Sequence, residues 1–287
     1  MSNVAIVTDS TASIPEPLIG ELNIHWVPYY IHRGNEVLRD LVTIQRDEFY
    51  SWMKTATELP QTASPGPGDY YKKYTHLIQQ GIKDIISIHM SSKGSGAYQA
   101  ALAAKSMITE NFPKIQIEVI DCLNVAMCQG WMAVEAARAA LMGNSMSQII
   151  QLVQEMIPKT KMIQTADTLK YLYMGGRIGR AKHLVASLLN IKPLISMENG
   201  EIVALGTAIS RQRAYKAMAN FIESRVGKMG KIKIAYVHAA AEEEVYKIKN
   251  LIEERVVCVE SIVTELSPAL GVHSGPGTAG VSYFPVA

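Results

Sequence analysis

Short apolar segments alternate with helix-like segments along the first half of the chain, and this alternation constrains the fold more than any other feature. The apolar segments suited to β-strands are 4–8, 24–31, 85–89 and 115–121. Helices are expected between and after them, at 46–56, 70–80, 97–110, 127–142 and 147–157. Because strands that alternate with helices usually pair in parallel, the sequence predicts a mostly parallel sheet with helices on both faces.

The second half of the chain follows a different pattern. Segments 194–197 and 202–205 flank Asn199-Gly200, a dipeptide that supplies the positive φ angles of a tight hairpin turn. Other strands are expected at 162–165, 232–238 and 256–263, and helices at 168–174, 211–225 and 242–254. We therefore predict a two-domain α/β fold. The N-terminal domain covers 1–158, the C-terminal α/β domain with the hairpin covers 159–287, and the boundary lies near Pro158.

The composition of the whole chain argues against several classes of protein. Its net charge of +2 is too small for the dense basic stripe of a nucleic-acid-binding protein, so we expect no nucleic-acid partner. Cys122, Cys128 and Cys258 are odd in number and lack metal-ligand spacing, which predicts reduced, buried thiols and no metal site. No basic leader opens the chain, and no apolar run approaches the roughly 18 residues of a membrane span. The protein is expected to be cytoplasmic, without a transmembrane segment.

The loop Ser91-Ser92-Lys93-Gly94-Ser95-Gly96 connects a predicted buried strand to a predicted helix. Open N–H groups and the helix dipole make the start of such a helix attractive to anions. The two glycines allow close approach of a ligand, and the Ser95 hydroxyl adds a donor. The same sequence also fits an ordinary helix-capping serine, so the loop alone leaves both interpretations open.

Two further segments carry candidate ligand groups. The segment 62–68 contains Pro65, Gly66 and Pro67, which hold the chain extended before a helix, and Thr62 offers a hydroxyl there. The alternative is a rigid connector. The segment 167–177 predicts a helix that ends at a double glycine followed directly by Arg177. A guanidinium placed there suits a carboxylate or phosphate because of its planar fork of donors.

The fourth segment is His273-Ser274-Gly275-Pro276-Gly277, where the histidine is expected in a Gly/Pro turn near the end of the chain. Residues 275–280 formally match the dinucleotide-binding pattern G-x-G-x-x-G. We reject that match, since the pattern should open a helix within a βαβ unit and a final strand is expected here instead.

Motifs for other chemistries are missing from the sequence. It contains no G-x-S-x-G elbow, no P-loop and no H-E-x-x-H motif. A hydrolase or small-molecule phosphotransferase that uses the Ser95 loop, with His273 as a base, remains an alternative. No orienting carboxylate for such a pair can be identified.

Taken together, the opening Thr8-Asp9-Ser10 and the four segments resemble the DegV family over nearly the whole chain. The most specific part is D-x-L-x-x-L-x-x-G-G-R, which is intact from Asp167 to Arg177. The chain departs from the family pattern at Gly94, where leucine is common, at Ala97, where threonine is usual, and at Gly66, which replaces a frequent serine.

The resemblance implies a function as well as a fold. It implies a long-chain fatty acid whose carboxylate lies between the two domains, hydrogen-bonded to Thr62 and Ser95, with Arg177 and His273 nearby. It also implies that the chain is the lipid-binding subunit for a separate ATP-dependent fatty acid kinase. The chain would then have no catalytic residues, metal or cofactor of its own. A lipid carrier or sensor without a kinase partner is the remaining alternative.

Overall fold

The N-terminal half of the protein is built on a four-stranded parallel sheet, in agreement with the sequence prediction. In this computed structural model, residues 4–187 and 191–286 are described. Residues 1–3, where no leader was expected, lie outside them. The sheet has the order β2-β1-β6-β7. The strands are β1 (Val4–Asp9), β2 (His25–Val27), β6 (Asp84–His89) and β7 (Gln116–Asp121).

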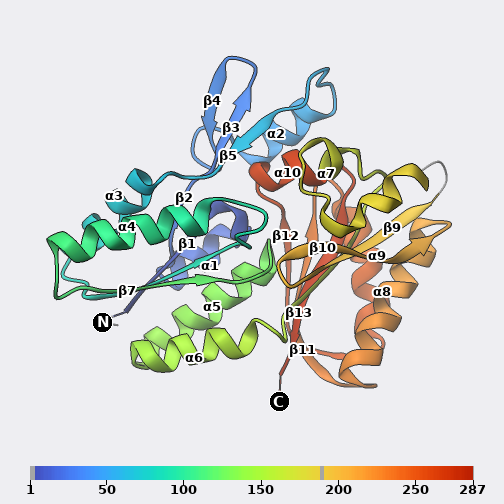
Figure 1. Cartoon of the computed structure of the whole chain (residues 1–287). Helices are drawn as coiled ribbons and strands as arrows, with labels where there is room; N and C mark the ends of the chain where they lie inside the picture. Colours follow the sequence, from blue (N-terminus) through green and yellow to red (C-terminus); the bar gives the residue numbers. More distant parts are fainter. Residues whose placement is uncertain (1–3, 188–190, 287) are drawn as a thin grey trace.

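Helices cover both faces of this sheet (Figure 1). On one face lie α3 (Pro67–Gln79) and α4 (Ala97–Asn111), and on the other α5 (Met127–Leu141) and α6 (Met146–Met156). Two shorter helices, α1 (Glu16–Glu21) and α2 (Arg46–Met53), complete this half. Almost every residue of α5 is buried, since the helix is enclosed between the parallel sheet and the second sheet of the molecule.

A small antiparallel sheet projects from the N-terminal half, and the sequence prediction missed it. Its order is β4-β3-β5, from β3 (Tyr30–Arg33), β4 (Glu36–Arg39) and β5 (Gln61–Ala63). The predicted single strand 24–31 was wrong, because β2 and β3 belong to different sheets. Pro28 lies at the break and has no N–H to donate to a ladder, which disfavours a continuous strand.

The C-terminal half contains a mixed sheet of six strands in the order β10-β9-β8-β13-β11-β12. Only β11 and β12 pair in parallel among these described strands. The Asn199-Gly200 hairpin is confirmed, with φ angles of 50° and 83°. The strands are β8 (Lys161–Thr165), β9 (Lys192–Glu198), β10 (Glu201–Ala208), β11 (Lys231–His238), β12 (Val257–Glu265) and β13 (Ala279–Pro285).

The helices of the C-terminal half divide into two groups. The outer face of the sheet carries α8 (Arg211–Val226) and α9 (Glu242–Glu253). Near the N-terminal half lie α7 (Lys170–Met174) and α10 (Pro268–Ser274), while the 3-10 segment η2 (Gly179–Ser187) packs against β10. The sequence placed His273 in a Gly/Pro turn, but it lies in the last turn of α10, and the turn begins at Gly275. Ser267 caps this short helix by accepting from the N–H of Leu270.

Polar contacts join α5 to the C-terminal sheet. The Trp131 indole N–H donates to the Ser282 carbonyl at 3.1 Å, and the Arg138 guanidinium donates two bonds of 2.7 Å to Glu260. Lys233 pairs with Glu135 at 2.8 Å. These contacts fix how the two sheets lie against each other. The division into domains at Pro158 stays a prediction.

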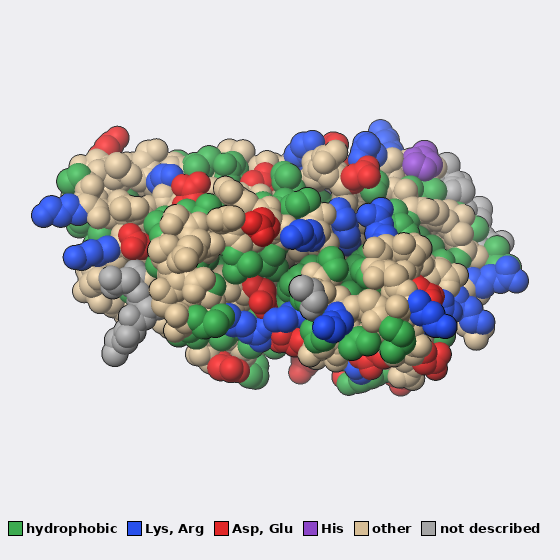
Figure 2. Space-filling model, turned by 90° about the horizontal axis from the view of Figure 1, so that it is seen from below, with side chains coloured by type: hydrophobic (Ala, Val, Ile, Leu, Met, Phe, Trp, Pro, Cys, Tyr) green, Lys and Arg blue, Asp and Glu red, His purple; other side chains and the backbone are tan. Residues whose placement is uncertain are grey.

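The surface carries side chains of both charges. Figure 2 shows acidic and basic groups interspersed over one face of the molecule, with no continuous basic stripe among the side chains drawn in colour. Within the described part of the chain, none of the helices has the length and apolarity needed to cross a lipid bilayer.

Candidate ligand-binding site

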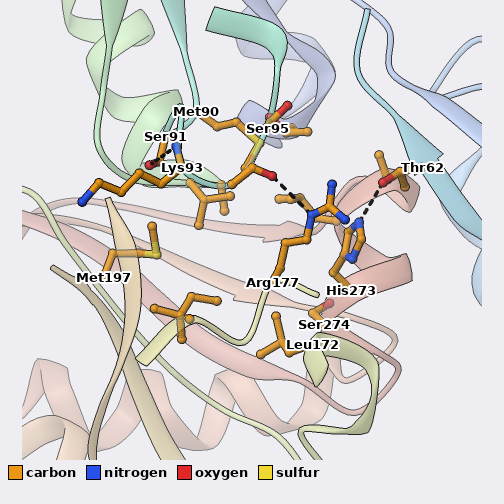
Figure 3. A pocket seen from close by; sticks show the side chains of 18 of the residues that line it. Thr62, Met90, Ser91, Lys93, Ser95, Leu172, Arg177, Met197, His273 and Ser274 are labelled. Atoms are coloured by element: carbon orange, nitrogen blue, oxygen red, sulfur yellow. Dashed lines mark hydrogen bonds between the residues drawn. The ribbon is translucent and has the colours of Figure 1, made fainter. Parts of the chain in front are cut away.

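A cavity of about 310 Å³ opens where the two halves of the molecule meet. Loops after the carboxyl ends of β1 and β6 contribute to it, as expected at the point where the chain order of a parallel sheet reverses. The C-terminal half contributes the hairpin turn, α7 and α10. All four candidate residues, Thr62, Ser95, Arg177 and His273, line this one cavity and gather at one end of it (Figure 3).

Thr62 and His273 form one polar pair at that end. Thr62 lies on β5, and its hydroxyl is 2.7 Å from Nε2 of His273 on α10. Burial, together with the nearby positive charge of Arg177, lowers the pKa of His273 to about 4. The imidazole is therefore neutral at pH 7, and its buried Nδ1 has no hydrogen-bond partner in the described structure.

Ser95 lies just before α4 and has two partners. Its hydroxyl oxygen accepts from the N–H of Ala97 at 3.2 Å and lies 2.6 Å from the hydroxyl of Tyr29. Ser95 is not the N-cap of α4, because Gly96 holds that position and the helix has no side-chain cap. The Ser95 hydroxyl lines the cavity instead. The start of α4 faces the same space, which favours a negatively charged ligand group there.

Arg177 reaches across from the C-terminal half to the Ser95 loop. Its Nε donates to the Gly94 carbonyl at 3.3 Å, and one terminal nitrogen donates to the Gly175 carbonyl at 2.6 Å. In Figure 3 the guanidinium lies between Ser95 and His273. Arg177 is exposed and its described partners are both carbonyl groups, so its charge stays available to a ligand or a partner.

Two glycines allow α7 and α10 to pack closely beside the cavity. A Cβ at Gly175 would lie 2.3 Å from Nδ1 of His273, and a Cβ at Gly275 would lie 2.1 Å from the ring of Tyr171. Gly275 also has a φ of 74° and a ψ of 158°, a conformation that other residues rarely adopt. The position of His273 therefore depends on the absence of side chains at both glycines.

Asp167, the first residue of the intact motif, acts at a distance from the cavity. Its carboxylate accepts from Arg211 at 2.6 Å and from Lys192 at 2.5 Å. The same Arg211 donates to the Gly277 carbonyl at 2.7 Å. Arg211 thus ties the segment that carries Arg177 to the turn that follows His273.

The hairpin turn closes the cavity on the opposite side. Ser91 is buried and donates its hydroxyl to the Gly200 carbonyl at 2.7 Å. Most of the remaining cavity wall is apolar, and three of the chain's methionines contribute to it. The apolar lining consists of Met90, Val125, Ala126, Met162, Leu172, Met197, Ile202, Leu266, Ala269 and Leu270.

Sequence reasoning missed several polar residues of the lining. Thr11 and Ser274 adjoin quoted motif residues, and the buried Ser274 hydroxyl has no partner in the described structure. Tyr29 was hidden by the wrong prediction of one strand over 24–31, although Pro28 was a signal against it. Ser64, Gln164 and Glu201 also belong to the missed polar lining.

The geometry argues against the hydrolase alternative. A nucleophilic serine needs a base within hydrogen-bond reach. Here the described partners of the Ser95 hydroxyl are Tyr29 and Ala97, while the described partner of His273 is Thr62. Over residues 4–187 and 191–286, no three His, Cys, Asp or Glu side chains come together to hold a metal ion.

Comparison with known proteins places the chain in a family. A model described as an uncharacterised protein of the DegV family matches residues 3–286. A DegV domain-containing protein of Caldanaerobacter subterraneus subsp. tengcongensis is 30% identical over 99% of both chains. The solved structure of DegV from Bacillus subtilis, described as a fatty acid binding protein, has a TM-score of 0.88 and 30% identity over 100% of both chains. That of a DegV family protein from Thermus thermophilus, described by its fatty acid binding, has a TM-score of 0.92 and 25% identity over 100% of both chains. Since the family model covers nearly the whole sequence, this chain belongs to the DegV family.

Proposed function

We propose that this protein binds a long-chain fatty acid, with the carboxylate beside Thr62 and Ser95 and the acyl chain along the apolar wall. The observation that carries the proposal is the division of the cavity lining. Thr62, Ser95, His273 and Arg177 gather at one end, while Met197 lies away from them (Figure 3). Ser91 and Lys93 are the polar groups beside the hairpin turn. The relatives from Bacillus subtilis and Thermus thermophilus, both described as fatty acid binding, support it.

The acyl chain supplies most of the affinity in this arrangement. Each methylene removed from water contributes about 0.8 kcal/mol, so about fourteen of them contribute ~11 kcal/mol before the costs of association. Met90, Met162 and Met197 line the cavity, and their flexible thioether side chains can adjust to a chain of a given length.

The polar end fixes the carboxylate without neutralising it. When Nε2 of the neutral His273 carries the proton, it donates to the Thr62 oxygen, and the Thr62 hydroxyl proton is free for the ligand. Hydroxyl donors hold a carboxylate more weakly than a bidentate arginine does. The carboxylate oxygen therefore keeps its nucleophilic character.

We further propose that a separate ATP-dependent kinase phosphorylates this carboxylate to an acyl phosphate. The sequence has no P-loop, so the nucleotide would come with the partner. Arg177 supports this role, since it is exposed, lies at the carboxylate end and has only carbonyl partners among the described residues. A carrier or sensor without a kinase partner would bind the same ligand and support no acyl phosphate formation.

We expect the double variant Thr62→Ala/Ser95→Ala to keep its fold and lose the fixation of the carboxylate. A hydrogen bond to a charged group contributes about 1.5–3 kcal/mol, and water replaces part of that loss. Affinity for the fatty acid should fall modestly because the acyl chain is still buried. Acyl phosphate formation should fall further, since the carboxylate is no longer oriented for transfer. Fluorescent fatty acid titration and a kinase assay measure the two effects.

Ser106→Ala/Thr109→Ala is the matched control for this variant. Both hydroxyls lie on the exposed side of α4 and donate only to carbonyls of their own helix. This control should leave affinity and rate unchanged. An unchanged rate of acyl phosphate formation in Thr62→Ala/Ser95→Ala would refute the assigned roles.

A further inference from the structure

Tyr29 is a buried residue of the cavity that the sequence motifs leave without a role. It lies between β2 and β3, is 4% exposed and lines the cavity beside the Ser95 loop. Its backbone is held on both sides, because its N–H donates to the Ser10 hydroxyl at 3.0 Å and its carbonyl accepts from the N–H of Asp40 at 2.9 Å. The ring therefore has a fixed position relative to Ser95.

The hydroxyl of Tyr29 remains protonated over the physiological pH range. Burial raises its pKa well above the ordinary value, and the negative charge of Asp9 raises it further. Asp9 is itself buried, accepts from the N–H of Thr11 at 3.1 Å and pairs with the buried His89 at 2.9 Å. The phenol thus offers one proton, and the Ser95 hydroxyl lies 2.6 Å from it.

The direction of this hydrogen bond decides what Ser95 can do. A serine hydroxyl has one proton and two acceptor sites. If Tyr29 donates, the Ser95 oxygen accepts from both Tyr29 and the Ala97 N–H, and its own proton is left for the cavity. If Ser95 donates to Tyr29 instead, it has no proton for a ligand. A carboxylate in the cavity selects the first arrangement because it can only accept.

We propose that Tyr29 is a positioning residue, which donates its hydroxyl proton to Ser95 and thereby directs the Ser95 proton at the ligand carboxylate. The inference rests on the proposed fatty acid binding and deepens it, since it makes the site selective for an anionic, acceptor-only headgroup. A fatty alcohol of the same chain length can donate its own proton to Ser95 and needs no such direction.

The test compares the affinities of Tyr29→Phe and wild type for palmitic acid and for hexadecanol. Each affinity is measured by the displacement of a bound fluorescent fatty acid. We expect Tyr29→Phe to weaken the acid about 5- to 20-fold and to leave the alcohol within twofold. The loss for the acid lies at or below the lower end for one hydrogen bond to a charged group, because water replaces part of that bond. In a Ser95→Ala background, Tyr29→Phe should have no further effect on the acid. Tyr30→Phe is the matched control, since its hydroxyl donates to Asp69 and does not line the cavity.

Several other outcomes of this binding test would contradict the proposed role of Tyr29. Unchanged acid binding by Tyr29→Phe, an equal loss of acid and alcohol, or additive losses with Ser95→Ala would overturn the positioning role. If wild-type protein itself binds neither ligand, fatty acid binding as the function fails, and the role of Tyr29 fails with it. Melting temperatures of all variants identify any loss that comes from unfolding.

Discussion

Replacing Gly275 with alanine is expected to destabilise the protein by about 2–6 kcal/mol. The φ of 74° with a ψ of 158° costs about 1–3 kcal/mol for a residue with a side chain. The added methyl carbon would also lie 2.1 Å from the Tyr171 ring, and relieving such an overlap costs about 1–3 kcal/mol more. Because relieving this overlap moves α10 away from α7, ligand binding should fall as well. Urea unfolding should show a lower midpoint with an unchanged slope.

Gly176→Ala separates the two causes of this loss. Gly176 also has a positive φ, of 69°, but a Cβ there would meet no atom within 4 Å. Its substitution should cost only the backbone part, about 1–2 kcal/mol. Equal destabilisation by the two substitutions would show that the contact between Gly275 and Tyr171 does not hold the two helices together.

Replacing Arg177 with alanine is expected to abolish most acyl phosphate formation while fatty acid affinity stays within a few-fold of wild type. The hydroxyls of Thr62 and Ser95 remain to hold the carboxylate. Negative charge accumulates when ATP approaches a carboxylate, and removal of one preorganised donor from such a transfer typically costs about 10²–10³ in rate. Arg177 also donates to the Gly94 carbonyl of the Ser95 loop, so its loss could act through that loop.

Affinity, melting temperature and kinase rate measured on one preparation distinguish these roles. Arg213→Ala is the control for the change in net charge, because Arg213 is exposed on α8, on the outer side of the C-terminal sheet. It should leave all three quantities unchanged. If Arg177→Ala loses affinity or melting temperature in proportion to its rate, Arg177 is a binding or structural residue and has no special role in transfer.

The regular part of the fold could be predicted from local sequence patterns. Each strand of the parallel sheet has an apolar segment, and the Asn199-Gly200 turn has the dipeptide that its backbone requires. The small antiparallel sheet was missed because its strands are three or four residues long and largely polar on one side. Strands this short carry too few residues for alternation to distinguish them from loops.

Local sequence patterns predicted the candidate site only as a set of separate loops, and the family resemblance alone brought their residues together. Each loop carried turn residues and a polar group, but spacing along the chain does not reveal that Thr62 and His273, 211 residues apart, lie in contact. Residues such as Tyr29 escape such reasoning because an aromatic residue in an apolar run looks like core. Its role depends on where the chain leaves one sheet for the next, which is a property of the tertiary structure.

Mass spectrometry of a denaturing organic extract tests the central proposal most directly. Protein purified from a bacterial host should release a long-chain fatty acid in nearly one-to-one amount, because the buried chain dissociates slowly when affinity is high. Extraction of the Gly275→Ala variant should release less. The absence of any acyl species from wild-type protein, together with no uptake of added fatty acid, would contradict the proposed function.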